Sequence, residues 1–196
     1  MGKATGPGYR VSQRRRRKNL TNYPKRMGLI KSKLPRMVVR KSSRHIIVQF
    51  IEYGVHGDKT ILSINSKELL KRGWPSRCNT PTAFLTGALA ANKVLKKGIK
   101  KSVLDIGLQT PSKGAIVFAA ARGAVAAGID MPIGEGMIDE LREKGTHIVD
   151  LAKALKGKPE YEARFSAYLK AGVDPENIVE LFEKTKDSIL RGEPSG

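Results

Sequence analysis

The chain has 196 residues, of which 40% are apolar, and it carries a formal net charge of +19 at pH 7. A chain of this length fits one domain of ordinary size with appendages. Its single cysteine, Cys78, excludes a disulfide framework and a cysteine-based zinc site, and favours a reducing compartment. No apolar run is long enough to span a membrane, and the N-terminal residues lack the apolar stretch of a secretory signal.

The positive charge is concentrated at the N-terminal end. The first 51 residues contain fifteen lysines and arginines and no acid, and the first acid is Glu52. A block of one sign opposes compaction by self-repulsion, so a polyanionic partner is the simplest reason for it. We therefore expect residues 1–34 to form a basic arm that neutralises nucleic-acid phosphates.

The arm shows no hydrophobic period over residues 1–24, and its early glycines and prolines, including Pro24, argue against an amphipathic helix. An extended conformation is expected there, followed by a possible helical turn within residues 25–33. The rings of Tyr9 and Tyr23 lie among the charges. They could stack on bases, or they could pin the arm to the folded domain.

Three short strands are predicted next, over residues 36–41, 45–53 and 60–64, because these segments are rich in β-branched residues and separated by turn residues. Strands so closely spaced in the sequence favour an antiparallel meander. Ser66 then stands where it could cap a short helix.

A helix is predicted to begin with Thr80 as its N-cap and to end at Gly98. Residues 102–106 resemble a short strand, and residues 114–127 form an apolar, Ala-rich helix of the buried kind. The resulting β-β-β-α-β-α order predicts an α/β core domain over residues 35–130. Its sheet should be mixed, with the last strand reached through a helical crossover.

The composition changes after residue 130. Helices are predicted over residues 137–145, 163–171 and 174–190, with Asp174 as the N-cap of the last. We expect residues 131–196 to be an acidic helical extension. Since like charge repels phosphate, this extension should contact neighbouring proteins rather than RNA.

Catalytic and metal-binding patterns are not apparent. The three histidines have no metal-site spacing, and no serine lies in a nucleophile elbow. The segment before the second core helix fails the phosphate-loop pattern, yet it places Thr110, Ser112 and Lys113 near a helix N-terminus. That arrangement fits a general anion site and an ordinary helix start about equally well.

The predicted strand and helix order is also that of ribonuclease-H-like nucleases, which need converging carboxylates to hold two metal ions. The first strand offers no acid, and Asp58 and Asp105 are too few and are expected to lie too far apart. We therefore expect a scaffold that binds rather than cleaves, with no catalytic residue, metal or cofactor. A general architectural DNA-binding protein fits the charge but not the apolar centre.

Several motifs together resemble one family. They include the run Arg14–Arg17, the segment Pro35–Ser42, Asn79-Thr80-Pro81 and Leu104–Leu108, with Thr21-Asn22-Tyr23, Lys71-Arg72-Gly73-Trp74 and Thr110–Gly114. From residue 5 to about residue 150, the chain resembles the archaeal type of large-subunit ribosomal protein eighteen, a family that binds 5S rRNA. Gln109 departs from the family pattern, because a histidine or asparagine is common at that position.

The resemblance implies a structural, non-enzymatic protein of the cytoplasmic ribosome that attaches 5S rRNA to the 23S-type rRNA in the central protuberance, beside neighbouring large-subunit proteins. It implies no membrane and no small-molecule substrate. The arm would thread between RNA segments, and the ends of the first hairpin would face the 5S rRNA. The RNA-binding residues so expected are Tyr9, Arg10, Arg14, Arg15, Arg16, Arg17, Lys18, Asn22, Tyr23, Lys25, Arg26, Arg36, Arg40, Lys41, Ser42, Arg44, His45, Lys71, Arg72, Trp74, Thr110, Ser112 and Lys113.

Overall fold

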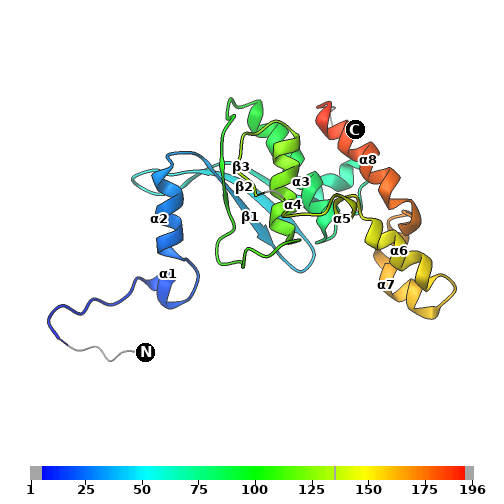
Figure 1. Ribbon diagram of the computed structural model, residues 1–196, viewed down its shortest axis with the longest axis horizontal. Coiled ribbons are helices and arrows are strands. Elements are labelled where there is room, and N and C mark those ends of the chain that lie inside the picture. Colours follow the sequence, from blue (N-terminus) through cyan, green and yellow to red (C-terminus); the bar gives the residue numbers. More distant parts are fainter. Residues whose placement is uncertain (1–5, 135, 193–196) are drawn as a thin grey trace.

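A four-stranded mixed sheet forms the centre of the computed structural model, which describes residues 6–134 and 136–192 (Figure 1). The strands are β1 (Arg36–Lys41), β2 (Ile46–Glu52), β3 (Lys59–Asn65) and β4 (Val103–Asp105). Their order is β3-β2-β1-β4, with antiparallel pairing except between β1 and β4, which run parallel. The predicted α/β class with a mixed sheet is thus confirmed.

The alternation of β1 separates the core from the surface that meets the arm. Met37 and Val39 are fully buried in the core. Because successive side chains of a strand point to opposite faces, Arg36, Val38 and Arg40 share the other face. Strand β1 therefore serves both the core and the arm side of the sheet.

Two helices, α3 (Thr80–Leu95) and α4 (Ile116–Ala126), are packed against each other and cover the core side of the sheet. Their backbones approach closely at two glycines. A Cβ atom built on Gly87 would lie 1.9 Å from the Ala120 carbonyl oxygen, and one on Gly123 would lie 2.0 Å from the Phe84 carbonyl oxygen. Only residues without a side chain fit at this crossing.

Both predicted helix caps in the core are displaced by one residue. The N-cap of α3 is Asn79, whose side-chain oxygen accepts a hydrogen bond from the Thr82 N–H at 3.0 Å, so Thr80 is the first helical residue. Residues Ser66–Arg72 form a 3-10 helix, η1, which Asn65 caps. In each case the asparagine before the hydroxyl residue supplies the acceptor, as good N-cap residues do.

The described residues of the C-terminal part form five helical elements. They are α5 (Glu140–Lys144), α6 (Thr146–Leu155), α7 (Pro159–Lys170), η2 (Pro175–Asn177) and α8 (Ile178–Leu190). Helix α6 was not predicted. Asp174 is an N-cap as predicted, because it accepts a hydrogen bond from the Glu176 N–H at 3.0 Å, but it caps the 3-10 turn η2, and the long helix α8 begins three residues later with Asn177 as its N-cap. The ring of Phe182 lies 6.1 Å from that of Trp74 and 5.5 Å from that of Phe84, so α8 completes the core.

The arm contains more helix than its sequence suggests. Residues Arg14–Arg17 form one exposed turn, α1, and residues Tyr23–Lys31 form helix α2, where an extended chain was expected through residue 24. Asn22 caps α2 by accepting from the Lys25 N–H at 3.1 Å. Pro24 is tolerated because N–H groups in the first helical turn have no intrahelical partner. Among the described residues, no helix is long and apolar enough to cross a membrane.

Candidate nucleic-acid interface

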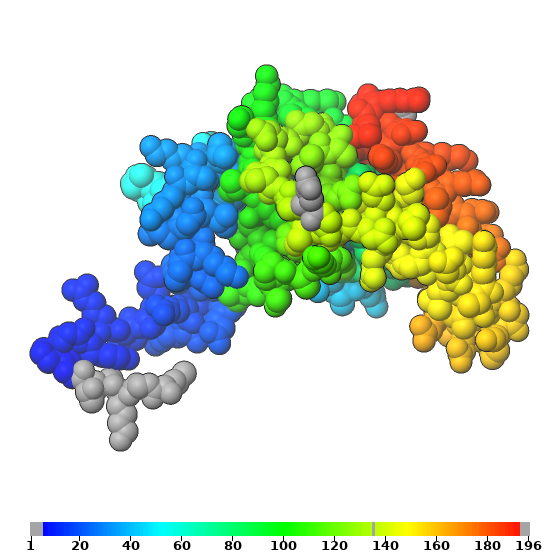
Figure 2. Space-filling model, viewed as in Figure 1, coloured from blue at the N-terminus to red at the C-terminus, as the bar shows by residue number. Residues whose placement is uncertain are grey.

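A groove of about 480 Å³ lies where the arm meets the sheet, and we call it the arm groove. Its lining combines residues of the α1–α2 segment, of strand β1, and of β4 with the loop that follows, together with one residue of β2 and one that precedes β3. They are Arg15, Leu20, Thr21, Asn22, Lys25, Arg26, Arg36, Val38, Val39, Arg40, Lys41, Ile51, Asp58, Asp105, Ile106, Gly107, Leu108 and Gln109. Seven of the expected RNA-binding residues, scattered from Arg15 to Lys41, are thereby brought together. The space-filling view shows the arm projecting beyond the body of the protein (Figure 2).

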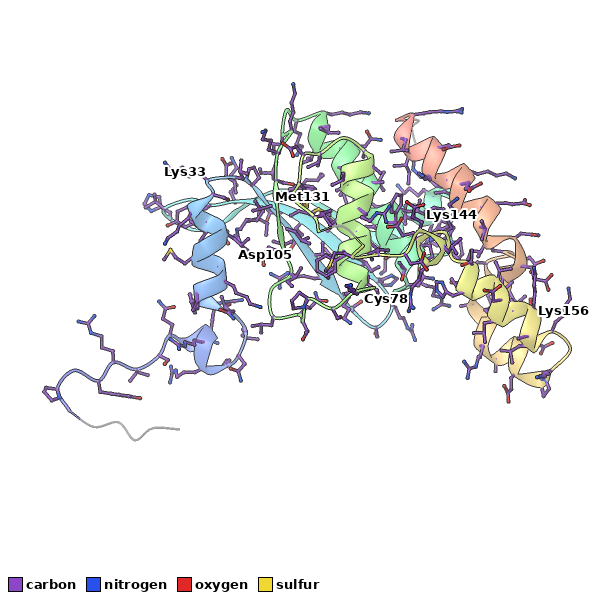
Figure 3. All side chains as sticks on the ribbon, viewed as in Figure 1. Lys33, Cys78, Asp105, Met131, Lys144 and Lys156 are labelled. Atoms are coloured by element: carbon purple, nitrogen blue, oxygen red, sulfur yellow. The ribbon has the colours of Figure 1, made fainter. Side chains whose placement is uncertain are left out.

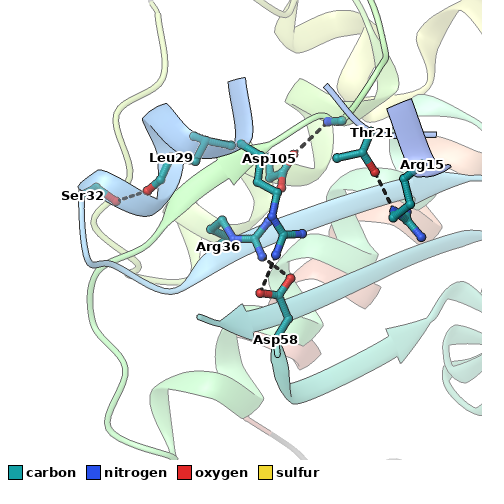
Figure 4. Close-up of polar contacts among 9 residues, drawn as sticks. Arg15, Thr21, Leu29, Ser32, Arg36, Asp58 and Asp105 are labelled. Atoms are coloured by element: carbon teal, nitrogen blue, oxygen red, sulfur yellow. Dashed lines mark hydrogen bonds and ion pairs between the residues drawn. The ribbon is translucent and has the colours of Figure 1, made fainter. Parts of the chain in front are cut away.

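Cations of the arm groove remain available to a ligand. Lys25, Arg40 and Lys41 are exposed, and among the described residues none of them has an ion-pair partner. Arg15 donates from Nε to the Thr21 hydroxyl at 2.7 Å, which fixes its side chain while leaving its charge uncompensated (Figure 4). The groove thus offers an uncompensated positive surface, the property that attracts phosphates.

Arg36 has a structural role instead of the expected RNA contact. Its guanidinium is buried and donates to Asp58 at 2.7 Å and to Asp105 at 2.6 Å (Figure 4). A buried charge is tolerated when it is paired in this way, and removing one partner is costly. The side chain is therefore not presented to RNA in this structure.

The expectation that Asp58 and Asp105 lie too far apart is wrong, because both contact one guanidinium. Pairing of β4 with β1 places Asp105 opposite Val38, close to Arg36, and the chain returns Asp58 to the same place just before β3. The two carboxylates are neutralised by Arg36 and do not form an open acidic pair. Within residues 6–134 and 136–192, no three His, Cys, Asp or Glu side chains form a group that could hold a metal ion.

A second basic region lies at the β1–β2 turn. Ser42 closes this turn, because its hydroxyl accepts from the His45 N–H at 3.0 Å and donates to the His45 carbonyl at 2.9 Å. Partial desolvation, then the nearby charges of Lys67, Arg44 and Arg77, lower the pKa of His45. Lys67 and Arg77 were missed by the sequence analysis because they are far from the basic run and only the fold brings them to this turn.

The loop before α4 is exposed at Thr110, Ser112 and Lys113. It is tied to the sheet by Gln109, whose side-chain amide donates to the Val39 carbonyl at 3.2 Å. Helix α4 begins at Ile116 without a side-chain cap, so neither predicted hydroxyl group occupies its N-terminus. Gln109, which departs from the family pattern, thus extends the hydrogen bonding along the β1 edge.

Most of the remaining expected residues fall into two groups, and Tyr23 belongs to neither. One group, exposed on the arm and outside the lining of the groove, comprises Tyr9, Arg10, Arg14, Arg16, Arg17 and Lys18. Tyr23 is half-buried in α2. The other group lies away from the groove near α8, where Arg72 donates to the Ser188 hydroxyl at 2.8 Å and Lys71 is exposed.

Trp74 is placed in the core, which overturns its expected contact with RNA. The side chain is fully buried, and its indole N–H donates to the Thr82 hydroxyl at 2.9 Å. A buried indole that has found its hydrogen-bond partner packs the core and cannot stack on a base. A tryptophan next to two basic residues has the same local pattern in either role, so the sequence could not separate them.

Comparisons with known proteins show the family to which the chain belongs. A family model described as ribosomal large subunit proteins 60S L5 and 50S L18 matches residues 8–101. Large ribosomal subunit protein uL18 of Thermofilum pendens is 48% identical over 190 residues, which cover 95% of this chain and 97% of that protein. The uL18 protein of Ignicoccus hospitalis is 46% identical over 191 residues, covering 95% of this chain and 94% of the relative. The resemblance inferred from the motifs is thus confirmed, and the chain belongs to the uL18 family of large-ribosomal-subunit proteins, which are structural proteins and not enzymes.

Proposed function

We propose that this protein binds 5S rRNA and attaches it to the 23S-type rRNA in the central protuberance. As a uL18-family protein it is a structural part of the large subunit of the cytoplasmic ribosome. The observation that carries the finer assignment is the arm groove, a cavity of about 480 Å³ lined by Lys25, Arg40 and Lys41, for which the described part of the chain provides no ion-pair partner. Phosphate neutralisation by such cations supplies much of the affinity of a protein for RNA.

The lining of the arm groove suits an RNA strand better than a simple anion. Leu20, Val38 and Ile51 contribute apolar surface beside the cations. Riboses and bases present apolar faces next to charged phosphates, and protein recognition of RNA uses both together with shape. The structure therefore supports a site for RNA with some selectivity, and the exposed arm adds further cations for the backbone.

We extend the proposal to the other exposed residues expected from the sequence. In it, the arm from Tyr9 to Lys18 runs along phosphates, and the turn with Arg44 and His45 and the loop with Ser112 and Lys113 contact further RNA segments. Arg36 and Trp74 act only by shaping the site.

We also propose a division into an arm (residues 1–34), a core domain of ribonuclease-H-like topology (residues 35–130) and a helical extension (residues 131–196). Of the arm and the extension, residues 1–5 and 193–196 lie outside the described part of the chain. In this division the extension meets neighbouring large-subunit proteins.

A competition gel shift tests the function. Labelled 5S rRNA is bound by the purified protein at about 0.15 M salt, where long-range electrostatics is largely screened, and is challenged with excess tRNA or duplex DNA. We expect 5S rRNA to stay bound while both competitors act weakly. Equal competition by tRNA or DNA would mean that the arm is only a polycation and would overturn the assignment.

The salt dependence of the affinity provides a second measurement. If roughly six to eight cations neutralise phosphates, the slope of log affinity against log salt should be on the order of −4 to −7. A slope near −1 would exclude a large contribution of the arm. Cleavage of 5S rRNA that requires divalent cations and is abolished by Asp105→Asn would instead support the alternative hypothesis of a nuclease.

A further inference from the structure

We propose that Asp58, a negative charge within a basic RNA-binding groove, strengthens RNA binding because it holds helix α2 in place. Asp58 would thus be a positioning residue and not an RNA contact. The inference rests on the proposed RNA-binding function and goes beyond it, because it assigns a role to a residue whose charge alone opposes RNA.

The geometry places Asp58 between two elements of the groove. One of its carboxylate oxygens accepts from Arg26 of α2 at 2.9 Å, and the other accepts from Arg36 of β1 at 2.7 Å. The Arg36 guanidinium is held from its other side by Asp105 at 2.6 Å (Figure 4). A chain of alternating charges therefore runs from the arm to the last strand of the sheet.

Helix α2 depends on this contact more than a typical helix would. It spans nine residues and has no fully buried residue, and its apolar side chains Tyr23, Leu29 and Ile30 are only half-buried, so hydrophobic burial holds it against the sheet only in part. Isolated helices of this length are marginal in water. Among the described residues, Arg26–Asp58 is the one ion pair that joins α2 to the rest of the protein.

This ion pair is better placed than a typical surface pair. The side chain of Asp58 is only 22% exposed, and it pairs with a guanidinium that is itself fixed, because Arg36 is 5% exposed and bound on both sides. Exposed pairs contribute little because two mobile side chains must be ordered in water. Here only Arg26 must be ordered, so more of the attraction is retained.

Docking of α2 matters for RNA because the helix carries part of the groove. Asn22 and Lys25 line the groove from the arm side, opposite Arg40 and Lys41. If only a fraction of the molecules has α2 docked, the apparent affinity falls by that fraction. Preorganisation of α2 therefore raises affinity without any contact between Asp58 and RNA.

The substitution Asp58→Asn separates this inference from simple electrostatics, because the two predict changes of RNA affinity in opposite directions. The variant loses one negative charge, so its net charge rises by one, and by Coulomb interaction alone this would tighten RNA binding. Loss of the Arg26–Asp58 ion pair instead leaves α2 docked in a minority of molecules. For a docked fraction of about one tenth, we expect the affinity for 5S rRNA to fall roughly tenfold. Asp58→Glu, which keeps the carboxylate, should recover most of the affinity.

Glu183→Gln is the matched control. It also removes one carboxylate and one ion pair, that with Lys144 at 3.3 Å, and it raises the net charge by the same amount. Lys144 lies away from Asp105, among the C-terminal helices (Figure 3). We expect Glu183→Gln to bind 5S rRNA as well as the unchanged protein does, or slightly better.

Amide hydrogen exchange of the full-length protein without RNA gives an independent readout. We expect the α2 amides to be protected in the unchanged protein, and to lose protection in Asp58→Asn while the sheet amides keep theirs. If Asp58→Asn also loosens the sheet, Arg26→Gln supplies the same exchange test with the Arg36 pairs intact, and α2 should again lose protection; its RNA affinity is not compared, because the substitution also removes a cation of the groove.

Two results would overturn the inference: an affinity of Asp58→Asn equal to or above that of Glu183→Gln, or unprotected α2 amides in the unchanged protein. Failure of the proposed function would look different, because the unchanged protein itself would then not select 5S rRNA over tRNA.

Discussion

The crossing of α3 and α4 makes a sharp prediction about stability. In an ordinary helix interior, Gly→Ala stabilises by about 1 kcal/mol, because alanine is the better helix former. Gly87→Ala should do the opposite, because the new Cβ atom would lie 1.9 Å from the Ala120 carbonyl oxygen. Relief requires a separation of at least 3.4 Å, so the two backbones must move apart by about 1.5 Å.

The expected loss of stability depends on which atoms can move to relieve the clash. Overpacking of a core costs about 1–3 kcal/mol, occasionally more, when side chains can adjust. At this crossing the obstacle is backbone, and the residues that face it, such as Phe84, Ala88 and Ala120, are buried. We therefore expect Gly87→Ala to lower the free energy of unfolding by a net of about 2–4 kcal/mol. At about 2–4 °C per kcal/mol for a chain of this size, the Tm should fall by roughly 5–15 °C.

The assay is thermal and urea unfolding followed by circular dichroism, with Gly28→Ala as the control. Gly28 lies within α2, and a Cβ atom there would have no atom within 4 Å. This control should unfold at the same temperature as the unchanged protein, or slightly above it. Gly123→Ala should behave like Gly87→Ala, and the double variant should lose less than the sum, because the first substitution already separates the helices. A Gly87→Ala protein that melts within 2 °C of the unchanged protein, a margin of about 1 kcal/mol or less, would refute the close approach.

Three further predictions concern the proposed RNA site. Trp74→Phe should cost about 1–3 kcal/mol of stability through the lost indole bond and volume, yet leave the 5S rRNA affinity of the folded protein unchanged; a selective loss of affinity would restore an RNA contact. Desolvation and neighbouring cations lower the pKa of His45, so the free protein holds this ring neutral near pH 7. Phosphate would raise that pKa, so affinity should increase as pH falls from 8 to 6, and His45→Gln should flatten the profile; equal pH profiles would remove His45 from the interface. Replacing Arg40 and Lys41 by Gln should weaken 5S rRNA binding and make the log–log salt slope less negative by about 1.5, whereas Lys170→Gln, on α7, should change neither measurement.

Local patterns predicted local structure well and long-range placement poorly. The β-branched runs located β1 and β2 to within a residue, because such side chains fit a pleated, half-buried surface. Helix α6 was missed although its core-facing residues, Ile148, Ala152 and Leu155, recur at helical spacing, so the sequence carried a signal that the analysis did not use. The family assignment succeeded because it used many motifs at once.

The candidate site shows the same contrast. The positive charge of the arm, of Arg40 and of Lys41 can be predicted from each residue of the sequence alone. The convergence of Asp58 and Asp105 on Arg36 is not, because it depends on the β1–β4 register and on the return of the chain to β3. The burial of Trp74 could not be predicted for a related reason, since Trp74 packs against Phe182 of α8, more than 100 positions away in the chain.

Completion of the core by α8 has a consequence for biosynthesis. Phe182 packs against Trp74 and Phe84, and the Asn92 side-chain amide donates to the Ile189 carbonyl. A chain still being translated therefore lacks the last wall of its core until α8 has been synthesised, although the basic arm is made before the sheet and the core helices. During that interval the nascent protein exposes both an aggregation-prone apolar surface and a basic segment that attracts RNA. A binding partner or chaperone that shields the emerging arm would act before the folded protein exists.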